Sequence, residues 1–320
     1  MVDLPSSVTI QEEGPREGFQ IEAGPIATAD KIRFIEALAE TGLKKIDCVS
    51  CVNPKRVPGM ADAEQVARGI RRKPDVVYTG LWLNSGGFER ALTMPLALIG
   101  SILVSASEPF SLKNSGKTID ETLADQRTAV DLYLAHQVEV RWGIIFTAFG
   151  CNYQGDVPIA QLLERVAQVL DIAQEKGVRL KGIYLADTVG WGVPLDVERR
   201  IGAVRERWPE MKIGLHLHDT RGTGLANAYA ALRLGVDQFD SSSAGLGGCP
   251  FAGHKGAAGN ICTEDLVFMC EEMGIETGVD LEALCECARL AEDIVGHPLP
   301  GSVMKGGSLR KLREKIAANV

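Results

Sequence analysis

The run Lys212-Ile-Gly-Leu-His-Leu217 decides the fold, together with the segments that follow it. It is short and largely apolar, and a helical pattern follows from Arg221 to Leu234 and closes at Gly235. A second short run, Gln238-Phe-Asp-Ser-Ser242, comes next. Strand, helix and strand at this spacing predict two parallel strands joined by a crossover helix.

The same alternation extends over most of the chain. Amphipathic stretches from Thr28 to Glu40 and from Pro158 to Glu175 have typical helix boundaries, with proline at one start and glycine just beyond each end. Eight units of strand and helix predict an α/β fold, a closed (β/α)8 TIM barrel, which typically needs about 250 residues. The expected strands are Val8–Gln11, Lys45–Val49, Val76–Leu81, Ile99–Ser105, Val138–Phe146, Leu180–Ala186, Lys212–Leu217 and Gln238–Ser242.

A doubly wound open sheet is the main rival architecture. Such a sheet usually has a glycine-rich turn after its first strand, and here that place holds the charged segment Glu13-Gly-Pro-Arg-Glu-Gly18. The barrel is therefore favoured. Two further helical patterns, near Glu264–Glu272 and Leu281–Ile294, are expected to close the barrel and to add a short C-terminal helical cap. We expect residues 1–275 to form the barrel and residues 276–320 to form the cap.

The composition is that of an ordinary globular protein. Of the 320 residues, 45% are hydrophobic and 24% are charged, which argues against disorder. The formal net charge of −8 makes nucleic acid or an anionic membrane a poor partner. The start of the chain lacks a basic segment followed by an apolar one, and the eight cysteines are scattered, so we expect a cytoplasmic protein with reduced thiols.

Polar residues gather where the strands of the predicted barrel end, which is where such barrels place their active sites. His216 and His218 are two apart on a strand and therefore point to the same side, into the barrel mouth. Two imidazoles on one inner face favour metal binding over a pair of core histidines. Glu17 and Asn260 offer oxygen ligands, and this mixed set suits Mg²⁺ or Mn²⁺ more than Zn²⁺, with Fe²⁺ and Co²⁺ left open.

Arg16 lies beside Glu17 after the first strand, and Asp47 lies near the end of the second. A guanidinium aimed at a carbonyl oxygen next to a metal ion would stabilise a developing enolate, and Asp47 could orient Arg16 or a water near the metal. Cys249 follows the glycine-rich segment Gly245-Leu-Gly-Gly248, where a thiol that acts as acid, base or nucleophile and an incidental cysteine are equally compatible with the residues. The pair Cys48 and Cys51 is expected to be ordinary packing, because no second pair completes a zinc site.

Several of these segments, taken in order, resemble the hydroxymethylglutaryl-CoA lyase family. The matching segments are Glu13-Gly-Pro-Arg-Glu-Gly-Phe-Gln20, Ser50-Cys-Val-Asn-Pro-Lys-Arg-Val-Pro-Gly-Met60, Ala186-Asp-Thr-Val-Gly190, His216-Leu-His-Asp219 and Ala244-Gly-Leu-Gly-Gly-Cys-Pro250. The resemblance implies a retro-Claisen cleavage of a 3-hydroxy-3-methylglutaryl-CoA-like thioester to acetyl-CoA and a keto acid.

The resemblance also implies a role for individual residues. Glu17, His216, His218 and Asn260 would bind the divalent metal. Arg16 would stabilise the enolate oxygen, Cys249 would act in proton transfer, and Asp187 would lie close to the substrate together with Gln20 and Ser50.

The chain departs from the family pattern near the expected site. The family has Asp where this chain has Glu17, and Glu where this chain has Asp47, so the two carboxylates have exchanged lengths. Tyr184 stands in place of a small residue and would fill room near the acyl group. The segment from Cys249 to Asn260 is about two residues longer, and His254 or Lys255 in it could meet a carboxylate or a CoA phosphate. The arginine expected at the end of the fifth strand matches Arg141 only with a one-residue shift.

Three functions remain open at this stage. The first is a lyase for hydroxymethylglutaryl-CoA or for a different branched 3-hydroxyacyl-CoA. The second is a Claisen-type enzyme that condenses acetyl-CoA, which usually carries a long C-terminal extension. The third is a non-catalytic barrel, against which the retained polar residues argue. We expect an acyl-CoA as partner and a homo-oligomer, either a dimer or a tetramer.

Overall fold

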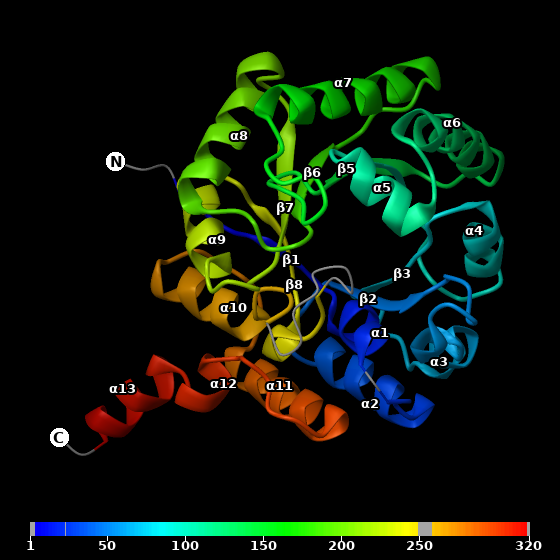
Figure 1. The fold of residues 1–320 in the computed structure, drawn as a ribbon. Coiled ribbons are helices and arrows are strands. Elements are labelled where there is room, and N and C mark those ends of the chain that lie inside the picture. The colour runs from blue at the N-terminus through cyan, green and yellow to red at the C-terminus, as the bar shows by residue number, and fades with distance from the viewer. Residues whose placement is uncertain (1–3, 23, 249–257, 319–320) are drawn as a thin grey trace.

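Eight parallel strands curl into a barrel with helices on the outside, as the computed structural model shows (Figure 1). The structure describes residues 4–22, 24–248 and 258–318. Neighbouring strands follow the order β3-β2-β1-β8-β7-β6-β5-β4, so the first and last strands of the chain lie side by side. The strands are β1 Thr9–Glu12, β2 Lys45–Ser50, β3 Val77–Leu81, β4 Gly100–Ser105, β5 Val140–Phe146, β6 Gly182–Asp187, β7 Lys212–Leu217 and β8 Gln238–Ser241.

Helices connect successive strands and cover the outer face of the sheet (Figure 1). The first connection also contains a one-turn π-helix, η1, directly after β1. The helices are η1 Gly14–Gly18, α1 Phe19–Ile21, α2 Thr28–Ala39, η2 Pro58–Met60, α3 Ala63–Gly69, α4 Ser85–Leu92, α5 Glu108–Ser115, α6 Ile119–Ala135, α7 Ile159–Glu175, α8 Pro194–Arg207, α9 Gly224–Leu232, η3 Ser243–Gly245, α10 Thr263–Glu272, α11 Leu281–Val295, α12 Val303–Gly306 and α13 Leu309–Ala317.

The predicted barrel and all eight predicted strands are confirmed, with boundaries that differ from the predicted ones by at most two residues. The helix expected from Arg221 begins three residues later because the side chain of Asp219 accepts a hydrogen bond from the Gly224 N–H at 2.7 Å and so fixes the start of α9. The barrel is least regular between β3 and β4. No ladder pairs these two strands within the described residues; instead, the Ala97 N–H donates to the Tyr78 carbonyl at 2.8 Å.

The apolar core lies between the strands and the helices. On α2, Phe34, Ile35 and Leu38 are fully buried at the helical spacing that turns one face toward the sheet. Leu284 and Ala288 of α11 belong to the same continuous core, so the C-terminal helices α11 and α12 pack on the barrel. The exact domain boundary at residue 275 stays a prediction.

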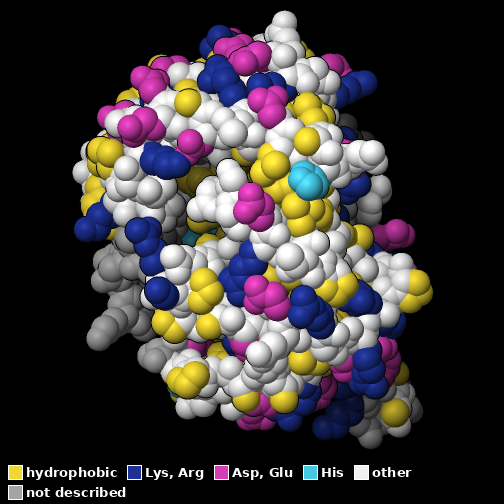
Figure 2. Space-filling model, turned by 90° about the vertical axis from the view of Figure 1, so that its right-hand side faces the viewer, with side chains coloured by type: hydrophobic (Ala, Val, Ile, Leu, Met, Phe, Trp, Pro, Cys, Tyr) yellow, Lys and Arg dark blue, Asp and Glu magenta, His cyan; other side chains and the backbone are white. Residues whose placement is uncertain are grey.

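The surface mixes charges of both signs. Figure 2 shows the face that carries α3, α4 and α6, where basic, acidic and apolar side chains are interspersed. Within the described segments, no helix is both long enough and apolar enough to cross a membrane.

Candidate metal centre

Three side chains from distant parts of the chain converge at the barrel mouth. Glu17 lies in η1, and its Oε1 is 3.0 Å from Nε2 of His218. Nε2 of His216, near the end of β7, lies 3.2 Å from Nε2 of His218 and 3.7 Å from Oε2 of Glu17. One ligand atom from each of the three residues lies within 4.8 Å of the other two. Two ring nitrogens and a carboxylate that meet at one point form a natural cation site.

Asn260 completes the oxygen donors. It pairs with His218 in an isolated β-bridge, and its Nδ2 donates to Oε1 of Glu17 at 3.0 Å. Its Oδ1 is buried and has no hydrogen-bond partner among the described residues. A buried carbonyl oxygen without a partner is costly unless a cation or a water satisfies it. The donors present therefore fit a hard divalent ion such as Mg²⁺ or Mn²⁺.

Asp240 orients the first histidine. It is the in-register partner of His216 across β7 and β8, and its Oδ2 lies 3.1 Å from Nδ1 of His216. A carboxylate on Nδ1 leaves Nε2 available to a cation. Burial lowers the pKa of His216, but Glu17 and Asp240 outweigh it and raise this pKa to about 10. The site thus favours a positive charge, which a bound metal ion would supply in place of the proton.

Arg16 is surrounded by three carboxylates, one at each guanidinium nitrogen. Nε donates to Oδ2 of Asp47 at 2.8 Å, and Nη1 donates to Oε2 of Glu17 at 2.9 Å. Nη2 donates to Oε2 of Glu13, whose Oε1 accepts from Nε2 of Gln11 at 2.7 Å. This arrangement fixes the guanidinium beside the metal ligands and leaves one N–H on each terminal nitrogen for a ligand.

Asp47 acts on Arg16 and not directly on the histidines. Its other oxygen, Oδ1, accepts from the Thr79 hydroxyl at 3.1 Å. Burial and the nearby charge of Glu13 raise the pKa of Asp47 to about 8, although Arg16 acts in the opposite direction. The predicted orienting role of Asp47 is consistent with these contacts.

Asp187 faces the loop after its strand. Its Oδ1 accepts from the Trp191 N–H at 2.7 Å and its Oδ2 from the Gly192 N–H at 2.9 Å. Burial raises the pKa of this carboxyl, while the two backbone donors act to lower it. These contacts give Asp187 a structural role in the β6–α8 loop, and its expected approach to the substrate stays a prediction.

Gln20 and Ser50 lie on the elements that follow or end the first two strands. Ser50 is the last residue of β2 and is fully buried, and Gln20 lies on α1. Oγ of Ser50 and Oε1 of Gln20 are buried and have no hydrogen-bond partner in the described structure. Their expected contact with the substrate stays a prediction.

Tyr184 points into the barrel, as the sequence predicts, and is the in-register partner of Gly214 on β7.

The predicted position of Arg141, at the end of the fifth strand, is wrong. Residues 137–139 precede the strand, with Gln137 at φ 57°, so β5 begins at Val140 and Arg141 is its second residue. Arg141 therefore sits at the amino end of the strand, away from the mouth, where its Nε donates to Oε2 of Glu139 at 2.7 Å.

Three predicted site residues, Cys249, His254 and Lys255, lie outside the described residues. Just before them, the described residues Leu246 and Gly247 lie close to the side chain of Asn260. Gly247 has φ +94°, and a Cβ there would lie 2.8 Å from Nδ2 of Asn260, so only glycine fits this approach. The described cysteines are all buried, and burial raises the pKa of the Cys48 and Cys51 thiols, which agrees with packing.

Two carboxylates at this site were missed from the sequence, namely Glu13 and Asp240. Strand periodicity would have found Asp240, because it alternates with Ser241 and faces the same interior as its neighbour His216 on the adjacent strand.

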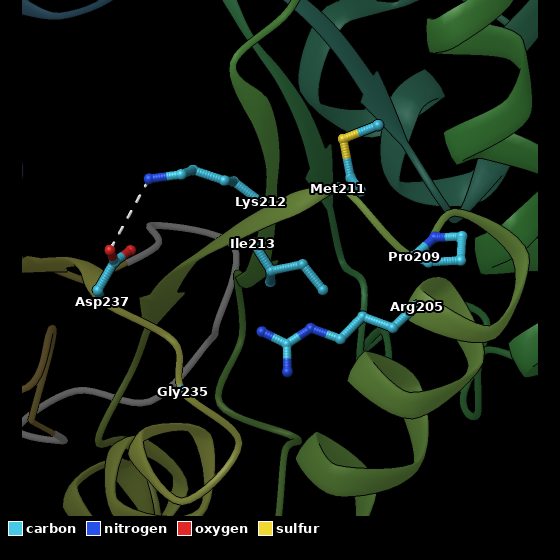
Figure 3. Close-up of a pocket in the computed structure, with 7 residues that line it drawn as sticks. All are labelled: Arg205, Pro209, Met211, Lys212, Ile213, Gly235 and Asp237. Atoms are coloured by element: carbon cyan, nitrogen blue, oxygen red, sulfur yellow. Dashed lines mark ion pairs between the residues drawn. The ribbon is translucent and has the colours of Figure 1, made fainter. Parts of the chain in front are cut away.

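A separate hollow of about 360 Å³ lies at the start of β7, at the other end of the strand from His216 (Figure 3). Its lining residues are Arg205, Pro209, Met211, Lys212, Ile213, Gly235 and Asp237.

Comparison with known proteins agrees with this arrangement. Residues 7–291 match the family model described as HMGL-like. The chain is 42% identical over 296 residues to hydroxymethylglutaryl-CoA lyase YngG of Bacillus subtilis, covering 92% of this chain and 96% of that protein. It is 40% identical to the 3-hydroxy-3-isohexenylglutaryl-CoA/hydroxy-methylglutaryl-CoA lyase of Pseudomonas aeruginosa, covering 92% and 95%.

A solved structure is similarly close. The HMG-CoA lyase from Acinetobacter baumannii in complex with coenzyme A and 3-methylmalate superposes with a TM-score of 0.85 at 36% identity, covering 96% of this chain and 97% of that one. The family model and the full-length relatives cover both the barrel and the residues that converge at its mouth. The chain therefore belongs to the HMGL-like family.

Proposed function

We propose that this protein is a divalent-metal-dependent carbon–carbon lyase that cleaves a 3-hydroxy-3-methylglutaryl-CoA-like thioester. The products are acetyl-CoA and a keto acid, which is acetoacetate when the substrate is hydroxymethylglutaryl-CoA. The observation that carries the proposal is the convergence of Glu17, His216 and His218 beside Arg16 at the mouth of an HMGL-like barrel. The names of the full-length relatives support the same reaction.

The reaction needs a proton removed and a carbanion stabilised. Loss of the 3-hydroxyl proton lets the C2–C3 bond break, C3 becomes the ketone, and the electron pair forms the enolate of acetyl-CoA, which then takes up a proton at C2. Glu17, His216, His218 and Asn260 would hold the metal, which supplies Lewis-acid polarisation of the substrate oxygens.

The chain itself supplies the positioned charges. Arg16 retains two N–H groups that face no described carboxylate, and these would donate to the thioester oxygen as it becomes an enolate oxygen. Glu13 and Asp47 hold the guanidinium in place, so the donors do not reorganise during the reaction. Cys249 would transfer a proton at the substrate.

Substrate contacts follow from the remaining expectations. Gln20 and Ser50 would accept hydrogen bonds from the substrate through their unpartnered oxygens. His254 or Lys255 would meet a carboxylate or a phosphate of the CoA ester. A homo-oligomer and a cytoplasmic location stay predictions, as does the choice between Mg²⁺ and Mn²⁺.

The test is to incubate the protein with Mn²⁺ or Mg²⁺ and a panel of 3-hydroxyacyl-CoA thioesters, and to follow acetyl-CoA by mass spectrometry. His216→Ala should abolish its release, whereas His297→Ala should not, because His297 is exposed and pairs with Glu22. Release from at least one branched member supports the proposal. Absence of acetyl-CoA from every member, with folded wild-type protein, would overturn it.

A further inference from the structure

Two aromatic side chains fill the barrel interior beneath the metal ligands. Tyr184 on β6 is 6% exposed, and its ring lies 4.9 Å from the ring of Trp142 on β5, edge to face at 84°. Tyr184 pairs in register with Gly214 and with Ile144, so it lies two residues below the level of Ala186 and His216. Two residues of a strand span about 7 Å, so Tyr184 forms the layer directly under His216.

Glycines on the neighbouring strands make room for the two rings. A Cβ on Gly214 would lie 2.6 Å from the Tyr184 ring, and a side chain there would displace the ring. A Cβ on Gly182 would lie 2.3 Å from the Lys212 carbonyl oxygen and 2.7 Å from the Trp142 ring, so backbone and ring both exclude it. Gly214 therefore gives the Tyr184 ring its room in the barrel.

The floor lies near the carboxylate that orients the first histidine. Burial and the nearby charge of Asp240 raise the pKa of the Tyr184 phenol well above its ordinary value. Asp240 in turn contacts Nδ1 of His216 at 3.1 Å. Tyr184 and His216 thus lie near the same carboxylate, which agrees with the position of the ring one layer below the histidine.

The direction of substrate entry decides which part of the substrate would lie next to these two rings. CoA is too large to enter a barrel whose interior is packed with side chains, so the acyl end must be the part that reaches inward. A substrate held by Glu17, His216 and His218 would then place its C3 substituents next to the floor. Space below that point is already occupied by Tyr184 and Trp142.

We infer that Tyr184 is a specificity-determining residue that restricts the C3 substituent of the substrate to a methyl-sized group. The inference rests on the proposed function and names the substrate class more closely: short 3-hydroxy-3-methyl thioesters are accepted, and a long C3 branch is rejected. Trp142 supports the Tyr184 ring from below. The size of the ring carries the selection, and the phenol oxygen is not needed for it.

The experiment compares kcat/KM for hydroxymethylglutaryl-CoA and for 3-hydroxy-3-isohexenylglutaryl-CoA. Wild type should favour the first by about 100-fold or more, since each poorly fitted methylene costs about tenfold or more in a closed pocket. Tyr184→Ser should reduce this ratio at least tenfold. Tyr184→Phe keeps the ring and should keep the ratio. Tyr184→Leu, an apolar replacement that suits the core, should give an intermediate ratio if the serine variant does not fold.

The outcomes separate the two proposals. The inference about Tyr184 is overturned if wild type cleaves both thioesters equally. It is also overturned if Tyr184→Ser and Tyr184→Leu leave the ratio of kcat/KM values unchanged. An equal change of the ratio in Tyr184→Phe also overturns it, because the ring size is then irrelevant. If wild type cleaves neither thioester, the proposed function fails. In that case the Kd values of the same two thioesters test the role of Tyr184. The preference for hydroxymethylglutaryl-CoA, measured as the ratio of the two Kd values, should be smaller in Tyr184→Ser than in wild type. An unchanged ratio contradicts the inference.

Discussion

Nε of Arg16 donates a hydrogen bond of 2.8 Å to Oδ2 of Asp47, while Nη1 of the same guanidinium donates to Glu17. One cation thus connects a carboxylate of β2 with a carboxylate that faces the two histidines. Glu17 is longer, and Asp47 shorter, than the carboxylates that resemblance to the lyase family leads one to expect at these places. The shared contact with Arg16 gives a physical route by which the two exchanges compensate each other.

The first prediction concerns this coupling. Glu17→Asp and Asp47→Glu should each lower kcat/KM by about 10- to 100-fold, because a shift of about 1 Å in a positioned group costs that much. The double variant should be at least tenfold more active than the product of the single effects predicts, since it restores the combined length around Arg16. Steady-state kinetics on the four proteins measures it, and simple additivity would refute the coupling.

The second prediction concerns the support of His216. Asp240→Asn should weaken Mn²⁺ binding by about 10- to 100-fold, because the carboxylate that fixes the imidazole loses its charge. Isothermal calorimetry gives the Kd directly. Asp237→Asn is the matched control, because Asp237 is partly exposed on the same segment and pairs with Lys212 at 3.9 Å. Equal Kd values for wild type and Asp240→Asn would argue against the role assigned to Asp240.

The third prediction concerns Glu13, which is buried and contacts Nη2 of Arg16. Glu13→Ala frees that nitrogen and leaves a buried positive charge less well paired, so kcat should fall by about tenfold or more. Glu13→Gln keeps the shape and an acceptor oxygen, and should lose less. The Mn²⁺ Kd should stay within about twofold of wild type in both, because the Glu13 side chain bonds Arg16 and Gln11, and only its backbone carbonyl, which both variants keep, contacts Glu17. A large change in Kd with unchanged kcat would place Glu13 in a different role.

The fourth prediction concerns pH. Burial raises the pKa of Glu264 from 4.5 to about 8, even though its Oε2 accepts from the Ala244 N–H at 2.9 Å. Between pH 4.5 and about 8, the Glu264 carboxyl therefore keeps its proton in the folded state and has lost it in the unfolded state. This contribution to stability is fully present below pH 4.5 and is lost as the pH rises through about 8.

The measurement is the free energy of unfolding from pH 5 to pH 8.5. Glu264→Gln mimics the protonated acid at every pH. The free energy of unfolding of this variant should therefore rise relative to that of wild type as the pH rises. Glu210→Gln, an exposed position, should follow wild type throughout. A constant difference between wild type and Glu264→Gln across this range would show that Glu264 does not change its protonation on unfolding.

Much of the fold follows from the sequence because each strand is a short apolar run bounded by turn residues. Element edges depend on local contacts that a pattern does not contain, such as the Asp219 side chain that delays the start of α9. Arg141 illustrates a different error: it matches the family pattern only with a one-residue shift, but it is the second residue of β5 and lies at the amino end of the strand. The irregular junction between β3 and β4 also depends on tertiary packing.

The convergence of His216, His218 and Glu17 could be predicted because strand periodicity and barrel geometry bring them to one edge. The carboxylates that support them are harder to recognise. Glu13 is one of several acidic residues in a charged segment, and its partner is known only once η1 has folded. The need for glycine at position 214 is likewise evident only from the structure, where the Tyr184 ring packs against it.

The most direct test of the account is product analysis with purified protein and hydroxymethylglutaryl-CoA, with Mn²⁺ present and again after complete chelation. The account predicts acetyl-CoA and acetoacetate in equal amounts with the metal, a loss of both on chelation, and recovery when Mn²⁺ is restored. Release of both products at an unchanged rate from the metal-free protein would contradict it, as would the absence of either product from the metal-loaded protein.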